Sequence, residues 1–575
     1  MRAPGHEIVI SPSPNDSLSV PQVAPNFRPT PQPLPELGRV GVELNEQQPL
    51  ALREAIELAL KNAKDIEVAR ENVRAAEFDL TGARGVYDPR LSSFSYYERT
   101  ETPSSSFLSG GAGGAVTQTN AVGTLSLQGL TPKGGGYRFD FSSIRLTTDN
   151  QFAALNPQYP TAFTFSYTQP ILRGRTFDDN RRRIEIAKKN LSLTDAQFRQ
   201  RAIETITSVQ RAYWDLVFSL RNLQIQRDAV RDARAQYEHN RRLVAEGQLA
   251  PIDVVAAEAQ VSGFEQSVYS ALDDVNRAEN NLKNLIAEDR TSPIWNVAIV
   301  PSDTVDAERP TIATLEQAMD AALRSRPELQ QSDVAIAINE LDQRLAREQS
   351  KPQVDLVASY GAVGLAGALD PAPSVNPFTA SSEVTRQRIN QLVAAVNGLS
   401  GTSNIQPIPA SSAQTLPNFL VGGYGQSLAN LAENRFNNFR VGVQLNLPLR
   451  NRTAEAQLGR SLVEGERAHT QRAQLEQLIQ IDVRNALQLT RTSESRLRAA
   501  SVARAASEQQ YASELRKFDA GQSTFFLVLE RQTALATARG NELRAQVELN
   551  KSIAELQRAT GNSLEANRVQ VRVRP

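Results

Sequence analysis

The chain has 575 residues, and its 63 lysines and arginines balance 63 aspartates and glutamates, so its charge does not favour a nucleic acid as partner. It has no cysteine and only three histidines, which excludes disulfides and argues against a metal centre or a histidine-based triad. No run of 18 apolar residues occurs, so no transmembrane helix is expected. The sequence therefore predicts neither an enzyme nor a bound metal or cofactor.

Residues 1–48 form a proline-rich N-terminal extension. The run at 29–35 (PTPQPLP) is typical of an extended, poorly ordered arm. The extension lacks the apolar stretch of a signal peptide. We therefore expect either a start from which such a peptide has been trimmed or a cytosolic protein.

An internal repeat is the most informative feature of the chain. Residues 52–97 align with residues 315–360 without a gap, at a constant offset of 263, and ten positions are identical. A repeat of this size indicates a duplicated array of helices and strands. The molecule should therefore be pseudo-symmetric, with its function along an axis rather than in one cleft.

The first half is predicted over residues 49–288. Its strands are recognised by alternation, since Tyr137, Phe139 and Phe141 are separated by polar residues. Its long helix is recognised by apolar residues at every third or fourth position, and it would run roughly 110 Å at 1.5 Å per residue. In chain order, the predicted elements are a helix at 49–84, strands at about 90–170, a long helix after Gly174, a turn near Gly247 and a return helix at about 252–288.

The second half is predicted over residues 312–562, after a linker at 289–311 and before a tail at 563–575. Its middle is a long insertion, rich in small residues and proline, which we expect to be a surface excursion. In chain order, the predicted elements are a helix at 312–350, a strand at about 353–361, the insertion at 363–435, a strand at 438–447, a long helix at about 453–518, a turn near Gly521 and a return helix at about 523–558.

Two turns and two strand-to-helix passages carry a resemblance to a known family. The turn at 246–254 (EGQLAPIDV) has a counterpart at 520–528 (AGQSTFFLV). The passage at 167–174 (YTQPILRG) has a counterpart at 444–451 (QLNLPLRN). Over residues 49–562, their order, spacing and duplication resemble the TolC-like outer-membrane efflux proteins, the outer-membrane factors of tripartite efflux and type I secretion systems.

The resemblance implies the fold class. The chain would be an α+β membrane protein with two tandem helix–strand–strand–helix repeats. Three chains, each giving four strands, would form a 12-stranded outer-membrane β-barrel that continues as a long periplasmic α-helical barrel. Two further strand-like segments, at about 119–129 and 135–147, exceed this plan. We expect them to form an extracellular hairpin or to lengthen the strands.

The resemblance also implies a function and partners. The chain would be a passive trimeric export channel in the outer membrane of a Gram-negative-type cell. It would join a periplasmic adaptor (a membrane fusion protein) and an inner-membrane transporter, and it would expel small molecules or secreted substrates. The residues alone leave two alternatives open: a coiled-coil periplasmic scaffold, or an adaptor protein without a membrane pore.

Three residues are implied at the periplasmic aperture: Asp253, Leu527 and Glu530. The copies differ here, because Leu527 replaces the aspartate and Glu530 has Ala256 as its counterpart. An aspartate near a helix start is equally explained by the helix dipole. The residues expected at the helical tips, where an adaptor would bind, are Gly247, Gln248, Gly521, Gln522, Phe525 and Phe526. The two phenylalanines have ordinary helix packing as an alternative role.

Overall fold

The computed structural model describes residues 39–103, 114–150, 152–303, 314–370, 377–399, 405–409 and 416–570. The predicted arm at 1–48 lies mostly outside these residues. Its last part forms a strand, β1 (Glu43–Leu50), which pairs in parallel with β7 (Val297–Pro301). Among the described residues, none of the helices is both long and apolar enough to cross a membrane.

The chain folds into two compact units, each built from three stretches of sequence. Unit 1 comprises Met1–Leu52, Ala212–Thr304 and Leu497–Val547, and unit 2 comprises the remaining stretches, Arg53–Arg211, Val305–Arg496 and Glu548–Pro575. The helices are α1 (Leu52–Asn62), α2 (Lys64–Arg84), α3 (Asp179–Ala245), α4 (Pro251–Ile286), α5 (Leu315–Ser325), α6 (Pro327–Gln349), α7 (Pro377–Leu399), α8 (Tyr424–Ala432), α9 (Arg452–Asp519), α10 (Phe525–Ala559) and α11 (Ser563–Ala566).

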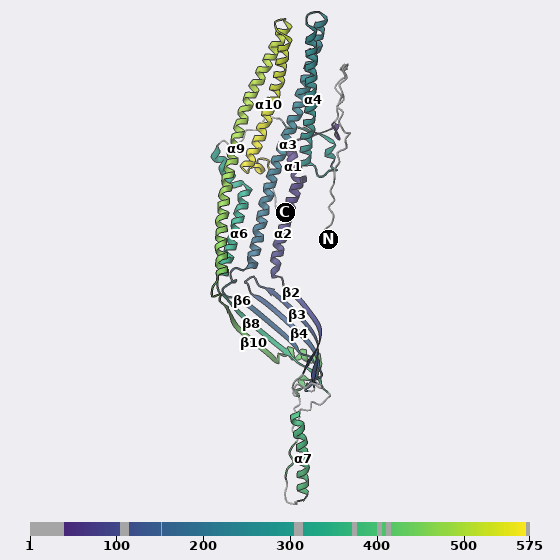
Figure 1. Ribbon diagram of the computed structural model, residues 1–575, viewed down its shortest axis with the longest axis vertical. Helices are drawn as coiled ribbons and strands as arrows, with labels where there is room; N and C mark the ends of the chain where they lie inside the picture. The colour runs from purple at the N-terminus through teal and green to yellow at the C-terminus, as the bar shows by residue number, and fades with distance from the viewer. Residues whose placement is uncertain are drawn as a thin grey trace, which may run out of the picture. The chain divides into compact units, whose positions relative to one another are not determined.

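Unit 2 contains an antiparallel sheet in which six long strands lie side by side in the order β10-β8-β6-β4-β3-β2 (Figure 1). Two short strands, β5 (Leu155–Gln158) and β9 (Gly367–Leu369), pair beside this row. The long strands are β2 (Arg90–Pro103), β3 (Ala115–Leu130), β4 (Gly136–Thr148), β6 (Thr161–Pro170), β8 (Gln353–Gly364) and β10 (Phe436–Asn446).

The expectation of four strands per chain is wrong, because the two extra segments are full members of the sheet. The hairpin β3–β4 lies between β2 and β6, which would be neighbours if the first half matched the second. Its turn is tight: the Thr131 N–H donates to the Gly135 carbonyl (2.7 Å), and Gly134 adopts φ +82°. The hairpin therefore widens the sheet instead of forming an excursion from it.

The sheet has one apolar and one polar face near the helices. Phe139 and Phe165 stack on the apolar face with ring centroids 4.7 Å apart. Because side chains alternate along a strand, residues in register share a face. One apolar row crosses all six strands through Phe439, Tyr360, Phe165, Phe139, Leu127 and Leu91. The adjacent row on the other face is Arg440, Ser359, Ser166, Arg138, Gln128 and Arg90.

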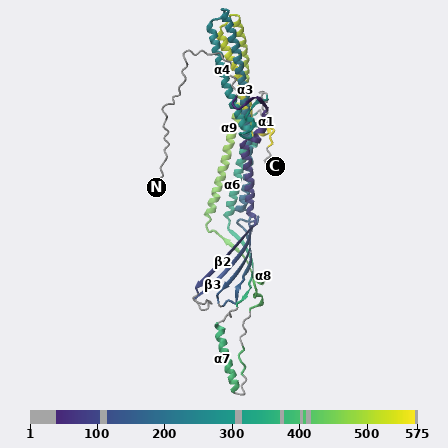
Figure 2. The same cartoon turned by 90° about the vertical axis from the view of Figure 1, so that its right-hand side faces the viewer.

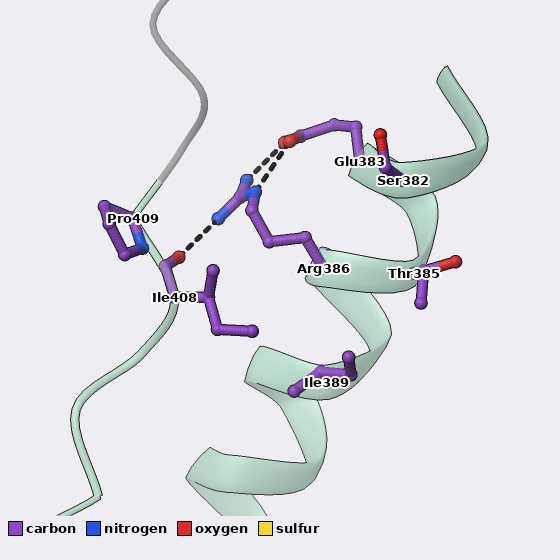
Figure 3. Close-up of a pocket in the computed structure, with 7 residues that line it drawn as sticks. All are labelled: Ser382, Glu383, Thr385, Arg386, Ile389, Ile408 and Pro409. Carbon is purple, nitrogen blue, oxygen red and sulfur yellow. Dashed lines mark hydrogen bonds and ion pairs between the residues drawn. The ribbon is translucent and has the colours of Figure 1, made fainter. Parts of the chain in front are cut away.

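The insertion in the second half is partly folded. Helix α8 lies beside the sheet (Figure 2). The Ser427 hydroxyl of this helix lies 2.9 Å from that of Thr161 in β6. Helix α7 extends from the end of the sheet that is far from α2 and α6. The extended segment 405–409 lies along α7, where the Arg386 guanidinium bridges the Glu383 carboxylate and the Ile408 carbonyl (Figure 3). The Asn390 side chain bonds both backbone groups of Ile408.

In unit 1, β7 is fixed to α4 by a buried charge cluster. Lys283 and Glu279 are almost fully buried; the Lys283 Nζ donates to the Trp295 carbonyl (3.0 Å), and Glu279 accepts from the Ile299 N–H (2.7 Å) and from Arg39 (2.8 Å). Every charge in the cluster therefore has a partner, as burial requires.

In unit 2, a second charge network ties the helices together. Asp482 of α9 accepts from Arg326, just before α6, and from Arg558 of α10, at 2.6 and 2.8 Å. Burial alone raises the pKa of Asp482, but hydrogen bonds and charges from the two arginines outweigh it and hold that pKa below its usual value. Glu328, paired with Arg326, has its pKa lowered in the same way.

We predict that Asp482→Asn destabilises unit 2 by on the order of 2 kcal/mol, because it leaves the buried Arg326 charge under-compensated. The matched control is Asp333→Asn, whose ion pair with Arg472 is more exposed and should contribute less than about 1 kcal/mol. Denaturant unfolding followed by circular dichroism measures both. Equal effects of the two substitutions would contradict a special role for the buried network.

The same network predicts a pH dependence. The folded-state pKa values of Asp482 and Glu328 lie below their unfolded values, so their ionised forms stabilise the fold above about pH 4. This stability should be lost as the pH falls through the folded-state values. Unfolding midpoints measured between neutral and acid pH should fall less steeply for Asp482→Asn than for the native chain.

Candidate functional site at the helical tips

The two helical hairpins of unit 1, α3–α4 and α9–α10, reverse direction through the same backbone turn. The Gln248 N–H donates to the Leu243 carbonyl and the Gln522 N–H to the Lys517 carbonyl, both at 2.8 Å. Gly247 and Gly521 adopt φ values of +72° and +73°. This is the Schellman motif, in which glycine takes the left-handed position that ends a helix. Both predicted turn glycines therefore have a structural role.

The two return helices begin differently. Helix α4 starts with Pro251, whose missing N–H costs nothing at that position. Asp253 lies in the first turn of α4 and is half-buried. Helix α10 starts with Phe525 and has no acidic residue in its first turn. The aspartate thus complements the helix dipole only in the first hairpin.

A small apolar core joins the hairpins near the tips. The rings of Phe518 and Phe525 have centroids 5.9 Å apart, and they pack with Ala257 of α4 and Val528 of α10. Phe525 is only 3% exposed. The packing role considered for the two phenylalanines therefore applies to Phe525.

Phe526, by contrast, is 72% exposed, and its equivalent in the first hairpin is Ile252, which is 68% exposed. Each residue lies five positions after its turn glycine. Together with the exposed Gln248 and Gln522, they place a large apolar side chain beside polar groups on both tips. Ile252 was missed by the sequence analysis, although aligning the two turns on their glycines points to it.

The three residues expected at an aperture do not meet within one chain. Leu527 is half-buried and Glu530 is exposed. Among the described residues, no hydrogen bond or ion pair joins Asp253 to Glu530. Neighbouring copies of the chain would be needed to bring these carboxylates together.

Few polar contacts hold the tips. The Ser523 hydroxyl donates to the Glu514 carboxylate, and this bond, with the nearby Lys517, lowers the pKa of Glu514. His239 of α3 lies 3.8 Å from Asp519 of α9. No group of three or more metal-binding side chains occurs in the described part of the chain.

Further along the hairpins, two buried amides are unsatisfied. Gln532 of α10 is 5% exposed, and neither its amide nitrogen nor its oxygen has a hydrogen-bond partner. The amide nitrogen of the buried Asn240 also has none. Each such group disfavours the packed state by about 1–3 kcal/mol. The packing of the hairpins is therefore weaker than an apolar core of the same size would give.

Comparisons with known proteins agree with this geometry. Residues 141–288, which include β6, α3, the Gly247 turn and α4, match the family "Outer membrane efflux protein". Over this stretch the chain is similar to the outer-membrane efflux proteins. No curated protein sequence matches it.

Solved structures show the same fold. The outer-membrane channel OprN is 14% identical with a TM-score of 0.58, over 94% of this chain and 99% of that one. The Campylobacter jejuni CmeC channel is 14% identical with a TM-score of 0.56, over 89% and 86%. The open state of the Neisseria gonorrhoeae MtrE channel is 15% identical with a TM-score of 0.56, over 89% of each chain.

The chain therefore has the fold of these outer-membrane channels, with long helices and β-strands, and it is similar to the outer-membrane efflux family over residues 141–288. The alternatives of a coiled-coil scaffold and an adaptor without a pore are not supported. The aperture and tip roles of individual residues stay predictions.

We predict that Gln532→Leu stabilises unit 1 by about 1–3 kcal/mol, because leucine fills a similar volume without an unsatisfied amide. The control is Gln509→Leu on the exposed surface of α9, which should change stability by less than about 0.5 kcal/mol. Both tryptophans, Trp214 and Trp295, lie in unit 1, so their fluorescence during heating reports its unfolding. A lower midpoint for Gln532→Leu than for the native chain would contradict the interpretation.

Proposed function

We propose that three copies of the chain assemble into a passive export channel that is gated at the helical tips. One observation carries the proposal: the sheet ends in two edge strands, β2 and β10, each with one unpaired edge, while an apolar row crosses all six strands. Both edge strands are exposed along their whole length.

An open sheet of this kind cannot lie in a membrane alone. Unpaired backbone groups in lipid cost several kcal/mol each, so a sheet there must close on itself. Strand β2 runs away from its helix and β10 runs back toward its own, so β10 of one copy can pair with β2 of the next in antiparallel fashion. Three copies, the number that the TolC-like fold implies, would close a sheet of eighteen strands instead of twelve.

The polar face would then line the pore and the apolar face would contact lipid. Aromatic residues such as Phe139, Phe165 and Phe439 would lie on the lipid side. No chemical step is needed in such a channel. Energy would come from an inner-membrane transporter, and the substrates would be small molecules or secreted molecules that pass through water.

The gate of the proposed channel is formed at the tips. Asp253 and Glu530 from three copies would give six carboxylates around the periplasmic entrance, which favours cations. A periplasmic adaptor would bind the tips through Ile252, Phe526 and the neighbouring glutamines, and it would draw the hairpins apart. The buried, unsatisfied Gln532 favours this opening because it weakens the closed packing.

We predict that a cysteine in β2 cross-links to a cysteine in β10 of another copy. The chain has no native cysteine, so Ser93→Cys can be combined in turn with Asn437→Cys, Phe439→Cys and Val441→Cys. At least one pair should give an inter-chain disulfide, and native mass spectrometry should show three chains. Ser143→Cys in the interior strand β4 is the control and should give none. A monomer without cross-links would exclude the closed sheet.

We also predict that Asp253→Asn with Glu530→Gln lowers the cation-over-anion permeability ratio by about twofold or more in planar bilayers. The control variant, Glu258→Gln with Asp274→Asn, removes the same charge farther along α4 and should leave the ratio unchanged. Unchanged selectivity and conductance in the first variant would exclude an aperture at these residues.

A further inference from the structure

Both strand-to-helix passages of unit 2 carry the same five-residue pattern, which the channel function does not use. Leu172–Thr176 (LRGRT) follows β6, and Leu449–Thr453 (LRNRT) leads from β10 into α9. Both stand at the end of the sheet that meets the helices. Neither copy contains an acidic residue.

Each pattern continues the apolar face of the sheet. After β10, Leu447 and Leu449 keep the alternation of Val443 and Leu445, and they are 54% and 100% exposed. After β6, Ile171 and Leu172 are also exposed. The apolar surface therefore reaches the point where the arginines begin.

The part of the chain that the structure describes gives the four arginines of the two patterns no charged partner. Arg173, Arg175, Arg450 and Arg452 make no side-chain hydrogen bond or ion pair within the described residues. The arginines that follow in α3 differ, because each has an aspartate partner: Arg181 with Asp178 (3.0 Å), Arg182 with Asp342 (2.5 Å) and Arg183 with Asp179 (2.7 Å). The guanidinium groups of the patterns are thus free to bind an external anion.

Both passages are held in place by backbone contacts. The paired Arg181 donates to the carbonyls of Gly174 and Arg175 at 2.9 and 2.7 Å. In the second passage, the Asn451 amide donates to the carbonyls of Gln349 and Ser350 at the end of α6. The β3–β4 turn adds a further cation, since Gln169 bonds the Lys133 carbonyl (3.1 Å). The cations are therefore presented on fixed loops.

We infer that these two passages bind the headgroups of anionic phospholipids in the periplasmic leaflet of the outer membrane. A guanidinium binds a phosphate with two parallel hydrogen bonds. Exposed leucines beside it match the acyl chains that begin at the same depth, as is usual where arginine stems lie along the membrane interface. The inference goes beyond export. It rests on the outer-membrane location of the sheet, not on gating, and it names lipid as the ligand because free phosphate would not use the leucines.

The test measures which lipid the intact protein retains. The full chain in neutral detergent is equilibrated with equal amounts of phosphatidylethanolamine and phosphatidylglycerol, separated by gel filtration, and its bound lipids are quantified by mass spectrometry. The native protein should hold about threefold more of the anionic lipid than of the neutral one. The variant R173Q/R175Q/R450Q/R452Q should hold the two lipids about equally.

Two further variants make the result decisive. Replacing the same four arginines by lysine keeps the charge and should keep most of the enrichment. The variant R221Q/R227Q/R467Q/R496Q removes four exposed arginines from the long helices, and it should retain the full enrichment of anionic lipid. If the quadruple glutamine variant does not fold, R173Q/R175Q and R450Q/R452Q are measured separately, and each should lose about half of the preference.

Unchanged enrichment in the glutamine variants, or an equal loss in the helix control, would overturn the inference. Conductance is recorded on the same preparations. A native protein that enriches anionic lipid but does not conduct would contradict the proposed channel and leave the lipid site standing. A native protein that conducts but does not enrich anionic lipid would contradict the lipid site and leave the proposed channel standing.

Discussion

An apolar sheet face bounded by two strands with unpaired outer edges is the constraint on which the rest of this structure depends. Aromatic and aliphatic residues in register across six strands form a surface that is unfavourable in water, while the bare edges β2 and β10 are unfavourable in lipid. One chain cannot satisfy both conditions. The proposed closure by identical copies would satisfy both without new side-chain chemistry.

At the tips, the two halves have the same backbone turn but expose different charged side chains. The same glycine turn ends α3 and α9, and the same outward position is apolar in both, as Ile252 and Phe526. The acidic side chains of the two hairpins differ, since Asp253 and Glu530 occupy non-equivalent positions. The two hairpins thus share the geometry of the turn but carry different charges. A buried amide that lacks partners, as in Gln532, fits the proposed opening of the tips, because a fully satisfied core would resist it.

Local signals were sufficient for the helices, the turns and the general fold. The long glycine-free stretch became α3, and the turns at Gly247 and Gly521 are as expected, since both depend on nearby residues. The predicted number of strands was wrong for a different reason. The alternation of Tyr137, Phe139 and Phe141 identifies a strand, but its neighbours are chosen by distant pairing that one sequence does not display. For the same reason, adjacent residues such as Phe525 and Phe526 were not separated into a buried and an exposed one.

The inserted hairpin also bears on how such a molecule can change over generations. A hairpin leaves and re-enters the sheet at one end, so it adds two antiparallel strands without altering β2, β10 or the helices that flank them. Sheet circumference grows with strand number. In the proposed channel, a single insertion in one loop would therefore widen the bore in the membrane and leave the helical tips unchanged.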